Sequence, residues 1–280
     1  LLFCLLTNAG NKALLLFFIL KPLNIMTLDK IGKYEFLVEP FHCDFSQRLF
    51  VGHLGNHLLN AADFHSNDRG FGMTYLNEIH KTWVLSRLAI ELECLPKAYS
   101  RMNVETWVDG VMRFFTHRNF KMADAQTGEV YGYGRSVWAM IDTQTRQPAD
   151  ILAIKEGSIV NYVDTEKPCP IDASSRVKMG GEADLVGSFE THYSDVDING
   201  HINSVKYLEH LFDLMPESWH STYRVKRLDV AYVAESHFGD VLHYFKEEVS
   251  PGDELYRIVK CTPDGNTAEA CRVAVKWAEK

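Results

Sequence analysis

The amino-acid sequence predicts an α+β fold in which one helix and one antiparallel sheet occur twice. Three observations predict it: each half of the chain has an apolar stripe at helical spacing, strand-like segments follow each stripe, and the two halves match in order. A chain of 280 residues suffices for one large or two ordinary domains. Because one such sheet alone leaves an unpaired edge, we expect each sheet to wrap its own helix and the two sheets to join side by side.

The first half, residues 26–142, is expected to contain a helix followed by strands. Apolar residues recur at helical spacing between residues 49 and 64. Residues 143–182 contain turn-forming stretches such as TEKPCPIDASS and are expected to be a linker. The strand-like segments of this half are 83–93, 104–110, 111–124 and 130–142.

The second half, residues 183–280, repeats this order. Its helix is expected to begin near Asn203 and Ser204, which are both good N-cap residues. The apolar stripe of that helix comprises Val205, Leu208, Leu211, Phe212 and Met215. The strand-like segments that follow are 223–235, 240–249, 254–261 and 270–278, with PDGN as the last hairpin turn.

The two halves can be aligned by eye, and the alignment separates their roles. LFVGHLGNHLLNAADF, from Leu49, lies over DINGHINSVKYLEHLF, from Asp197, and RLAIELEC lies over RLDVAYVA. Of the candidate site residues, only the histidine is then shared, as His53 and His201. We therefore expect the first half to line an apolar pocket and the second to carry the reaction. The polar residues Asp197, Asn199 and Glu235 stand opposite the apolar residues Leu49, Val51 and roughly Leu95.

The segment DINGH carries the candidate chemistry. In an extended segment Asp197, Asn199 and His201 would point the same way, and the N-terminus of the following helix would favour an oxygen that gains negative charge. Hydrolysis of a thioester needs a base to activate water and donors to hold the carbonyl oxygen, which these residue types supply without a metal or cofactor. Ordinary turn and capping chemistry explains the same residues equally well when the motif is taken alone. The absence of these polar groups from the aligned first half favours function.

The stretch DVDINGHINSVKYLE resembles the signature of plant and bacterial acyl-acyl carrier protein thioesterases. The similarity extends from about Tyr34 to Trp277 and includes GFGMTYLNE, WVLSRLAIEL, ETWVDG, TGE and SVWAMID. The resemblance implies two hotdog folds in tandem and the hydrolysis of fatty acyl chains from acyl carrier protein. It implies neither a cofactor nor a metal.

The resemblance also implies roles for individual residues. The family's catalytic Asp, Asn, His and Glu fall on Asp197, Asn199, His201 and Glu235. The cysteine that follows the glutamate in plant members is Ser236 here, which argues against a Cys/His mechanism. The hypothesis is that Glu235, together with His201, activates water, that Asn199 and backbone N–H groups hold the oxyanion, and that Asp197 orients His201 or shares the role of base.

The expected partner is acyl carrier protein. A net charge of −8 argues against nucleic acid, and an acidic carrier protein needs local cations at the pocket mouth. The first candidates for carrier docking are Lys206, Arg224, Lys226 and Arg227, with Arg113, Arg118 and Lys121 as others. A homodimer is compatible with the sequence.

The six cysteines are scattered without a C-x-x-C pair, which indicates reduced thiols in a cytoplasmic protein. The N-terminal residues 1–25 are apolar, but TNAGNK interrupts them below the length that spans a bilayer, so no stable membrane insertion is expected. The first methionine is Met26. The hypothesis is that residues 1–25 are read from upstream of the real start, with a degenerate signal or anchor as the alternative.

Two other functions are compatible with parts of this pattern. An acyl-CoA thioesterase of the same fold would share the site, whereas hydratases of this fold space their site residues D-x-x-x-x-H and Asp197 and His201 are only four apart. A non-catalytic acyl-binding hotdog protein would not need the polar residues that the second half has. Acyl chain length and saturation are outside what the sequence predicts.

Overall fold

The structure, a computed structural model, describes residues 28–280, so the hypothesis about residues 1–25 concerns residues outside the described part. A single ten-stranded sheet dominates the fold, in the order β1-β3-β4-β5-β2-β7-β10-β9-β8-β6, with every neighbouring pair antiparallel. The strands are β1 (Gly32–Leu37), β2 (Lys81–Leu92), β3 (Arg101–Val111), β4 (Phe115–Asp124), β5 (Val130–Asp142), β6 (Asp184–Glu190), β7 (Tyr223–Tyr232), β8 (Val241–Ser250), β9 (Asp253–Cys261) and β10 (Thr267–Glu279).

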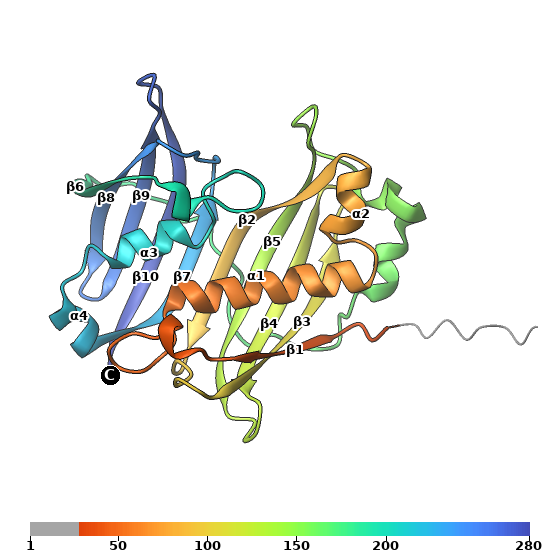
Figure 1. The fold of residues 1–280 in the computed structure, drawn as a ribbon, viewed down its shortest axis with the longest axis horizontal. Coiled ribbons are helices and arrows are strands. Elements are labelled where there is room, and N and C mark those ends of the chain that lie inside the picture. The colour runs from red at the N-terminus through yellow and green to blue at the C-terminus, as the bar shows by residue number, and fades with distance from the viewer. Residues whose placement is uncertain (1–27) are drawn as a thin grey trace, which may run out of the picture.

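The helices lie on one face of this sheet, α1 across the N-terminal strands and α3 across the C-terminal ones (Figure 1). The stripe predicted between residues 49 and 64 forms α1 and buries Leu54 and Leu58 completely. Each such leucine stabilises the fold by about 1.5–3 kcal/mol. The helices are α1 (Val51–Asp68), α2 (Met73–Glu78), α3 (Lys206–Phe212) and α4 (Glu217–Thr222).

The two halves meet where β2 pairs with β7. Arg87 lies opposite Ala231, and Glu91 lies opposite Arg227, so the pairing is symmetric about Ala89 and Asp229. These two central residues occupy the same place in RLAIELEC and RLDVAYVA. The strand alignment and the side-by-side joining expected from the sequence are therefore confirmed, and an internal pseudo-twofold axis passes between β2 and β7.

Each half also has elements that the sequence prediction missed. Strands β1 and β6 precede the two helices and form the outer edges of the sheet. Strand β6 has no buried residue, so it lacks the apolar alternation that identifies a half-buried strand. The expected linker contains the 3₁₀ segment Ile151–Tyr162, whose isoleucines at 151, 154 and 159 are buried.

The helix predicted in the second half is divided in two. Apolar residues continue the stripe to Met215, but α3 ends at Phe212 and α4 begins at Glu217. Pro216 stands between them and serves as the N-cap of α4. Proline has no N–H to donate and disfavours helical geometry in the residue before it, which explains the break.

Candidate active site

The segment 197–201 forms a tight turn, so the extended conformation in which Asp197, Asn199 and His201 would point the same way is not adopted. Asp197 N donates to the carbonyl of His201 at 2.8 Å, and Gly200 N donates to the carbonyl of Asp197 at 3.0 Å. The Asp197 carboxylate accepts from Asn199 N at 2.8 Å. Gly200 has φ of 79°, a left-handed conformation that glycine adopts without strain. The turn satisfies its own backbone groups, and Asp197 has the capping role that turn chemistry assigns to it.

Glu235 and His201 come together at this turn. Nε2 of His201 lies 3.5 Å from Oε2 of Glu235, and both side chains are about 70% buried, with 27% and 30% of their surface exposed. Ile202 N donates to the carbonyl of Ser236 at 2.8 Å, which fastens the turn to the segment after β7. The structure thus places the imidazole and the carboxylate within reach of one bound water molecule.

A third charged group, Arg146, was missed by the sequence prediction. Its guanidinium donates to Oε2 of Glu235, the oxygen that also faces His201. Burial raises the pKa of Glu235, but the hydrogen bond from Arg146 and the charges of His201 and Arg146 outweigh burial and hold the pKa below its ordinary value. Glu235 is therefore ionised at neutral pH. The turn sequence DTQTRQPAD carries no signal that would single out its arginine.

All four predicted site residues line one cavity of about 740 Å³, which we call the active-site cavity. The C-terminal half contributes the turn 197–201 and Glu235 to its lining, and side chains of α1, β2 and β5 line it from the N-terminal half. Apolar side chains line it, among them Leu59, Leu85, Val108 and Trp138 of the N-terminal half and Ile159 of the linker. Ser236 is fully buried and is not among the lining residues, so no serine nucleophile faces the cavity.

A buried polar group lies within the N-terminal wall. Arg118 donates to Ser66 Oγ at 2.8 Å and to Thr106 Oγ1 at 3.1 Å, and burial lowers its pKa to about 10. Burial likewise raises the pKa of neighbouring Asp63. Arg118 therefore cannot dock a carrier protein, and that expectation was wrong because its side chain is inside the molecule.

The other docking candidates differ in their availability. Arg227 donates to Asp229 and Glu91 at the junction of β2 and β7, and Arg113 pairs with Asp150, so neither presents a free cation. Lys206 pairs with Glu209 at 2.6 Å, and Arg224 lines a different cavity. Lys226 and Lys121 take part in no ion pair among residues 28–280, and Lys226 is the exposed one of the two.

A second turn of the same design occurs in the N-terminal half at residues 44–48. Asp44 N donates to the carbonyl of Arg48 at 2.8 Å, and Gln47 N donates to the carbonyl of Asp44 at 2.9 Å. Ser46 N donates to the Asp44 carboxylate at 2.8 Å, and Gln47 has φ of 60°. Every one of these contacts repeats one in the turn 197–201, so Asp44, Ser46 and Arg48 are the counterparts of Asp197, Asn199 and His201.

This equivalence corrects the alignment made by eye. The segment 49–53 was matched to 197–201 on the shared Gly-His pair, but Gly52 and His53 lie inside α1 and Gly200 lies in a turn. The true counterpart is five residues earlier in the chain. The N-terminal half has therefore kept the aspartate and has an arginine, not a histidine, at the position of His201.

Comparisons with known proteins agree with this arrangement. Residues 30–154 match the model of the acyl-ACP thioesterase N-terminal domain, and residues 181–279 match that of the C-terminal domain. The chain is 22% identical over 240 residues to oleoyl-acyl carrier protein thioesterase 2, chloroplastic, from Arabidopsis thaliana, covering 81% of this chain and 65% of the relative. It is 26% identical to a dodecanoyl-[acyl-carrier-protein] hydrolase of Cinnamomum camphora, covering 67% of this chain and 51% of the relative. The chain thus spans about half to two thirds of the length of these curated relatives.

Solved structures give the same result. An acyl-ACP thioesterase from Bacteroides thetaiotaomicron has a TM-score of 0.81 at 49% identity, covering 89% of this chain and 98% of that one. The 12:0-ACP thioesterase from Umbellularia californica has a TM-score of 0.75 at 20% identity, covering 91% and 99%. The tandem hotdog arrangement of α+β class expected from the sequence is confirmed. Within residues 28–280, no helix has the length and apolar character needed to cross a membrane.

Proposed function

The chain belongs to the acyl-ACP thioesterase family, and from that premise we propose that it hydrolyses fatty acyl-acyl carrier protein to a free fatty acid and holo-acyl carrier protein, which ends fatty acid synthesis. The observation that carries the proposal is the His201–Glu235 pair, 3.5 Å apart, on the wall of a cavity of about 740 Å³. The apolar walls suit an alkyl chain, and the pair suits the thioester at its end.

The reaction that we propose needs only groups of this chain and water. Glu235 and His201 hold the attacking water and take its proton as the oxygen bonds to the thioester carbonyl carbon. Collapse of the tetrahedral intermediate breaks the carbon–sulfur bond, and the proton passes to the leaving thiolate. The products are the fatty acid and the carrier thiol.

Asn199 is the proposed donor to the oxyanion. Its Nδ2 lies 3.4 Å from Oδ2 of Asp197, a long contact that leaves amide hydrogens available to substrate. Helix α3 begins only at Lys206, so the turn, rather than the helix, is the proposed source of the remaining donors. Asp197 positions Asn199 through the backbone and side-chain contacts of the turn, and we assign it that role in place of orienting His201.

Hydrolysis of acyl-acyl carrier proteins of graded chain length, with the matching acyl-CoA series beside them, tests the proposal. His201→Ala and Asn199→Ala should each lower kcat by about 10²–10⁴-fold without loss of folding. Near-normal turnover by either variant contradicts the site assignment. Faster turnover of acyl-CoA than of every carrier-bound substrate would replace the carrier protein with coenzyme A as the leaving group.

Three further expectations belong to the same proposal. The first is a division of labour, with residues 26–142 as the acyl-pocket half, 143–182 as the linker and 183–280 as the catalytic half. The second is a cytoplasmic location, which is supported by five unpaired cysteine thiols among the described residues and is tested by cell fractionation. The third is the homodimer, for which the free edges β1 and β6 offer a pairing surface and sedimentation gives the mass.

A further inference from the structure

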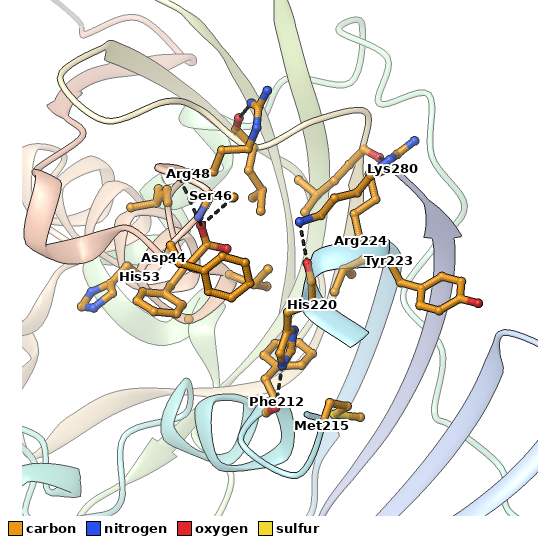
Figure 2. A pocket seen from close by; sticks show the side chains of 18 of the residues that line it. Asp44, Ser46, Arg48, His53, Phe212, Met215, His220, Tyr223, Arg224 and Lys280 are labelled. Carbon is orange, nitrogen blue, oxygen red and sulfur yellow. Dashed lines mark hydrogen bonds between the residues drawn. The ribbon is translucent and has the colours of Figure 1, made fainter. Parts of the chain in front are cut away.

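A second cavity of about 800 Å³ is lined by the turn 44–48 (Figure 2). This turn belongs to the N-terminal half, and the apolar lining of the cavity comes from both halves, with α3, β7 and β10 as the C-terminal part. In Figure 2 Asp44, Ser46 and Arg48 lie on one side and Arg224 on the other. The apolar side chains include Phe45, Phe50, Phe212, Met215 and Trp277.

The second cavity is the counterpart of the active-site cavity, residue by residue. Arg48 occupies the place of His201. The carbonyl of Pro96 accepts from Leu49 N, as the carbonyl of Ser236 accepts from Ile202 N, so Leu95 occupies the place of Glu235. Arg48 donates to the carbonyl of Leu95, just as His201 faces the side chain of Glu235. A cavity of the same origin has therefore kept its size while its reacting groups have changed.

The second cavity lacks the paired histidine and glutamate of the active site. Leucine stands where the carboxylate would be, and a guanidinium accepts no proton at neutral pH. His53 also lines the cavity, but it stacks on His42 at 4.1 Å between ring centroids. Burial, together with His42, lowers its pKa below the ordinary value. No carboxylate of residues 28–280 lies within ion-pair distance of His53, so the acid–base pair of the active site has no equivalent here.

Two cations of the second cavity remain available for a ligand. Arg48 donates to the main-chain carbonyl of Leu95, just beyond β2, and Arg224 donates to that of Leu92, the last residue of β2. Neither forms an ion pair with any carboxylate of residues 28–280. Each guanidinium has five N–H donors, and one contact to a carbonyl leaves most of them free.

Carboxylates also line the second cavity, but they do not neutralise these two arginines. Asp44 accepts three hydrogen bonds within its own turn, and Glu209 pairs with Lys206 at 2.6 Å. The other three are exposed, whereas both arginines are half-buried. The remaining carboxylates are Glu93, Asp213 and Glu217.

We propose that the second cavity binds a fatty acid without turning it over, with the alkyl chain against the apolar wall and the carboxylate between Arg48 and Arg224. Guanidinium groups bind carboxylates through paired, charge-assisted hydrogen bonds, and the apolar wall excludes small hydrophilic anions as preferred ligands. The ligand class follows from the cavity alone. The proposed reaction would release such a ligand, so the site would report the level of product.

Calorimetric titration of the full chain with dodecanoate tests this proposal. We expect two binding sites in the native protein. In Arg48→Gln/Arg224→Gln the affinity of the second cavity for dodecanoate should fall by about ten- to a hundredfold, so that only the active-site cavity still binds at the same concentration. Dodecanol should bind the second site no better in the native protein than in the double variant. Arg101→Gln, which removes an exposed arginine elsewhere, is the matched control and should keep both sites. One site in the native protein, or two sites that the double variant leaves unchanged, overturns the proposal.

A second measurement uses only the native chain and so does not depend on the folding of a variant. Dodecanoate with a photoreactive group at its methyl end should label peptides that contain Phe212 or Met215, in addition to the active-site cavity. Labelling confined to the active-site cavity contradicts the proposal. Both measurements need no turnover, so a protein that hydrolyses nothing but labels Phe212 would refute the proposed function and leave the fatty acid site standing.

Discussion

Arg146, at the start of the linker after β5, contacts the reacting groups through a single oxygen of Glu235. It has φ of 60°, an uncommon conformation for a residue with a side chain. Since Glu235 works in its ionised form, activity should fall as the pH falls through its pKa. Arg146 stabilises the ionised carboxylate and lowers the pKa of Glu235, so the loss of activity should occur at a lower pH than it would without Arg146.

Arg146→Gln should therefore move the acidic limb of the kcat/KM profile to higher pH, because burial alone raises the pKa of Glu235. Arg146→Lys keeps a positive charge at this position, so its acidic limb should lie close to that of the native protein. The measurement is the pH dependence of hydrolysis for the three proteins. An unchanged acidic limb in the glutamine variant would mean that Arg146 does not act on the ionisation of Glu235.

At the residue scale the sequence predicted the motif but not its surroundings. Asp197, Asn199 and His201 were identified because a dense polar motif before a helix is visible in the chain itself, whereas Glu235 was assigned through the family resemblance; all four line one cavity. Arg146 was not identified, since its partner is 89 residues away and only the fold brings them together. Arg118 was assigned to the surface because its local sequence does not indicate that the side chain is buried.

At the element scale, the two halves share the same order of elements but differ in their helices. Helix α1 is an unbroken 18-residue helix, whereas Pro216 separates α3 from α4 over the matching length. Both halves place a turn with an aspartate cap before the helix. The alignment made by eye failed at this turn because it followed a two-residue identity, Gly-His. The hydrogen-bond pattern that the two turns share cannot be seen in the sequence. The strands, with longer matching segments, aligned correctly.

The turn itself gives a prediction with a matched control. Gly200 and Gly128 both have left-handed φ, 79° and 75°, and a methyl group at either position would meet no atom within 4 Å. Alanine at either site should therefore cost about 1–2 kcal/mol of stability through backbone strain alone. Only Gly200→Ala should also lower kcat, because it shifts the turn that holds Asn199 and His201.

Thermal unfolding and hydrolysis rates measured on both alanine variants test this. Gly200→Asn, with a residue that tolerates the left-handed region, should recover part of the lost activity. Equal activity in Gly200→Ala and Gly128→Ala would show that the turn geometry is not limiting for catalysis.

At the scale of the whole molecule, the junction of β2 and β7 makes two hotdog units one body. One core cluster includes Leu58 of α1 and Leu208 of α3, so neither half buries its apolar face alone. The sequence predicted this joining from the unpaired edge that a single sheet would leave, and the pairing of β2 with β7 confirms it. The outer edge β6 escaped prediction because this exposed strand lacks apolar alternation, whereas β1 was missed although Tyr34 and Phe36 alternate with exposed residues.

The junction also contains a charged cluster whose removal should weaken the whole protein. Asp229 accepts from Arg227 at 2.7 Å and from Ser175 N at 2.8 Å, with side chains only 9% and 12% exposed for the ion pair. Asp229→Ala leaves Arg227 without its closest partner in a partly dehydrated place and should cost about 3 kcal/mol. Glu35→Ala breaks the exposed pair with Arg101 and should cost less than about 1 kcal/mol. Urea unfolding of both variants gives the two values, and since the halves share one core, Asp229→Ala should unfold in a single transition at lower urea. A separate early transition of one half would mean that the junction does not couple them.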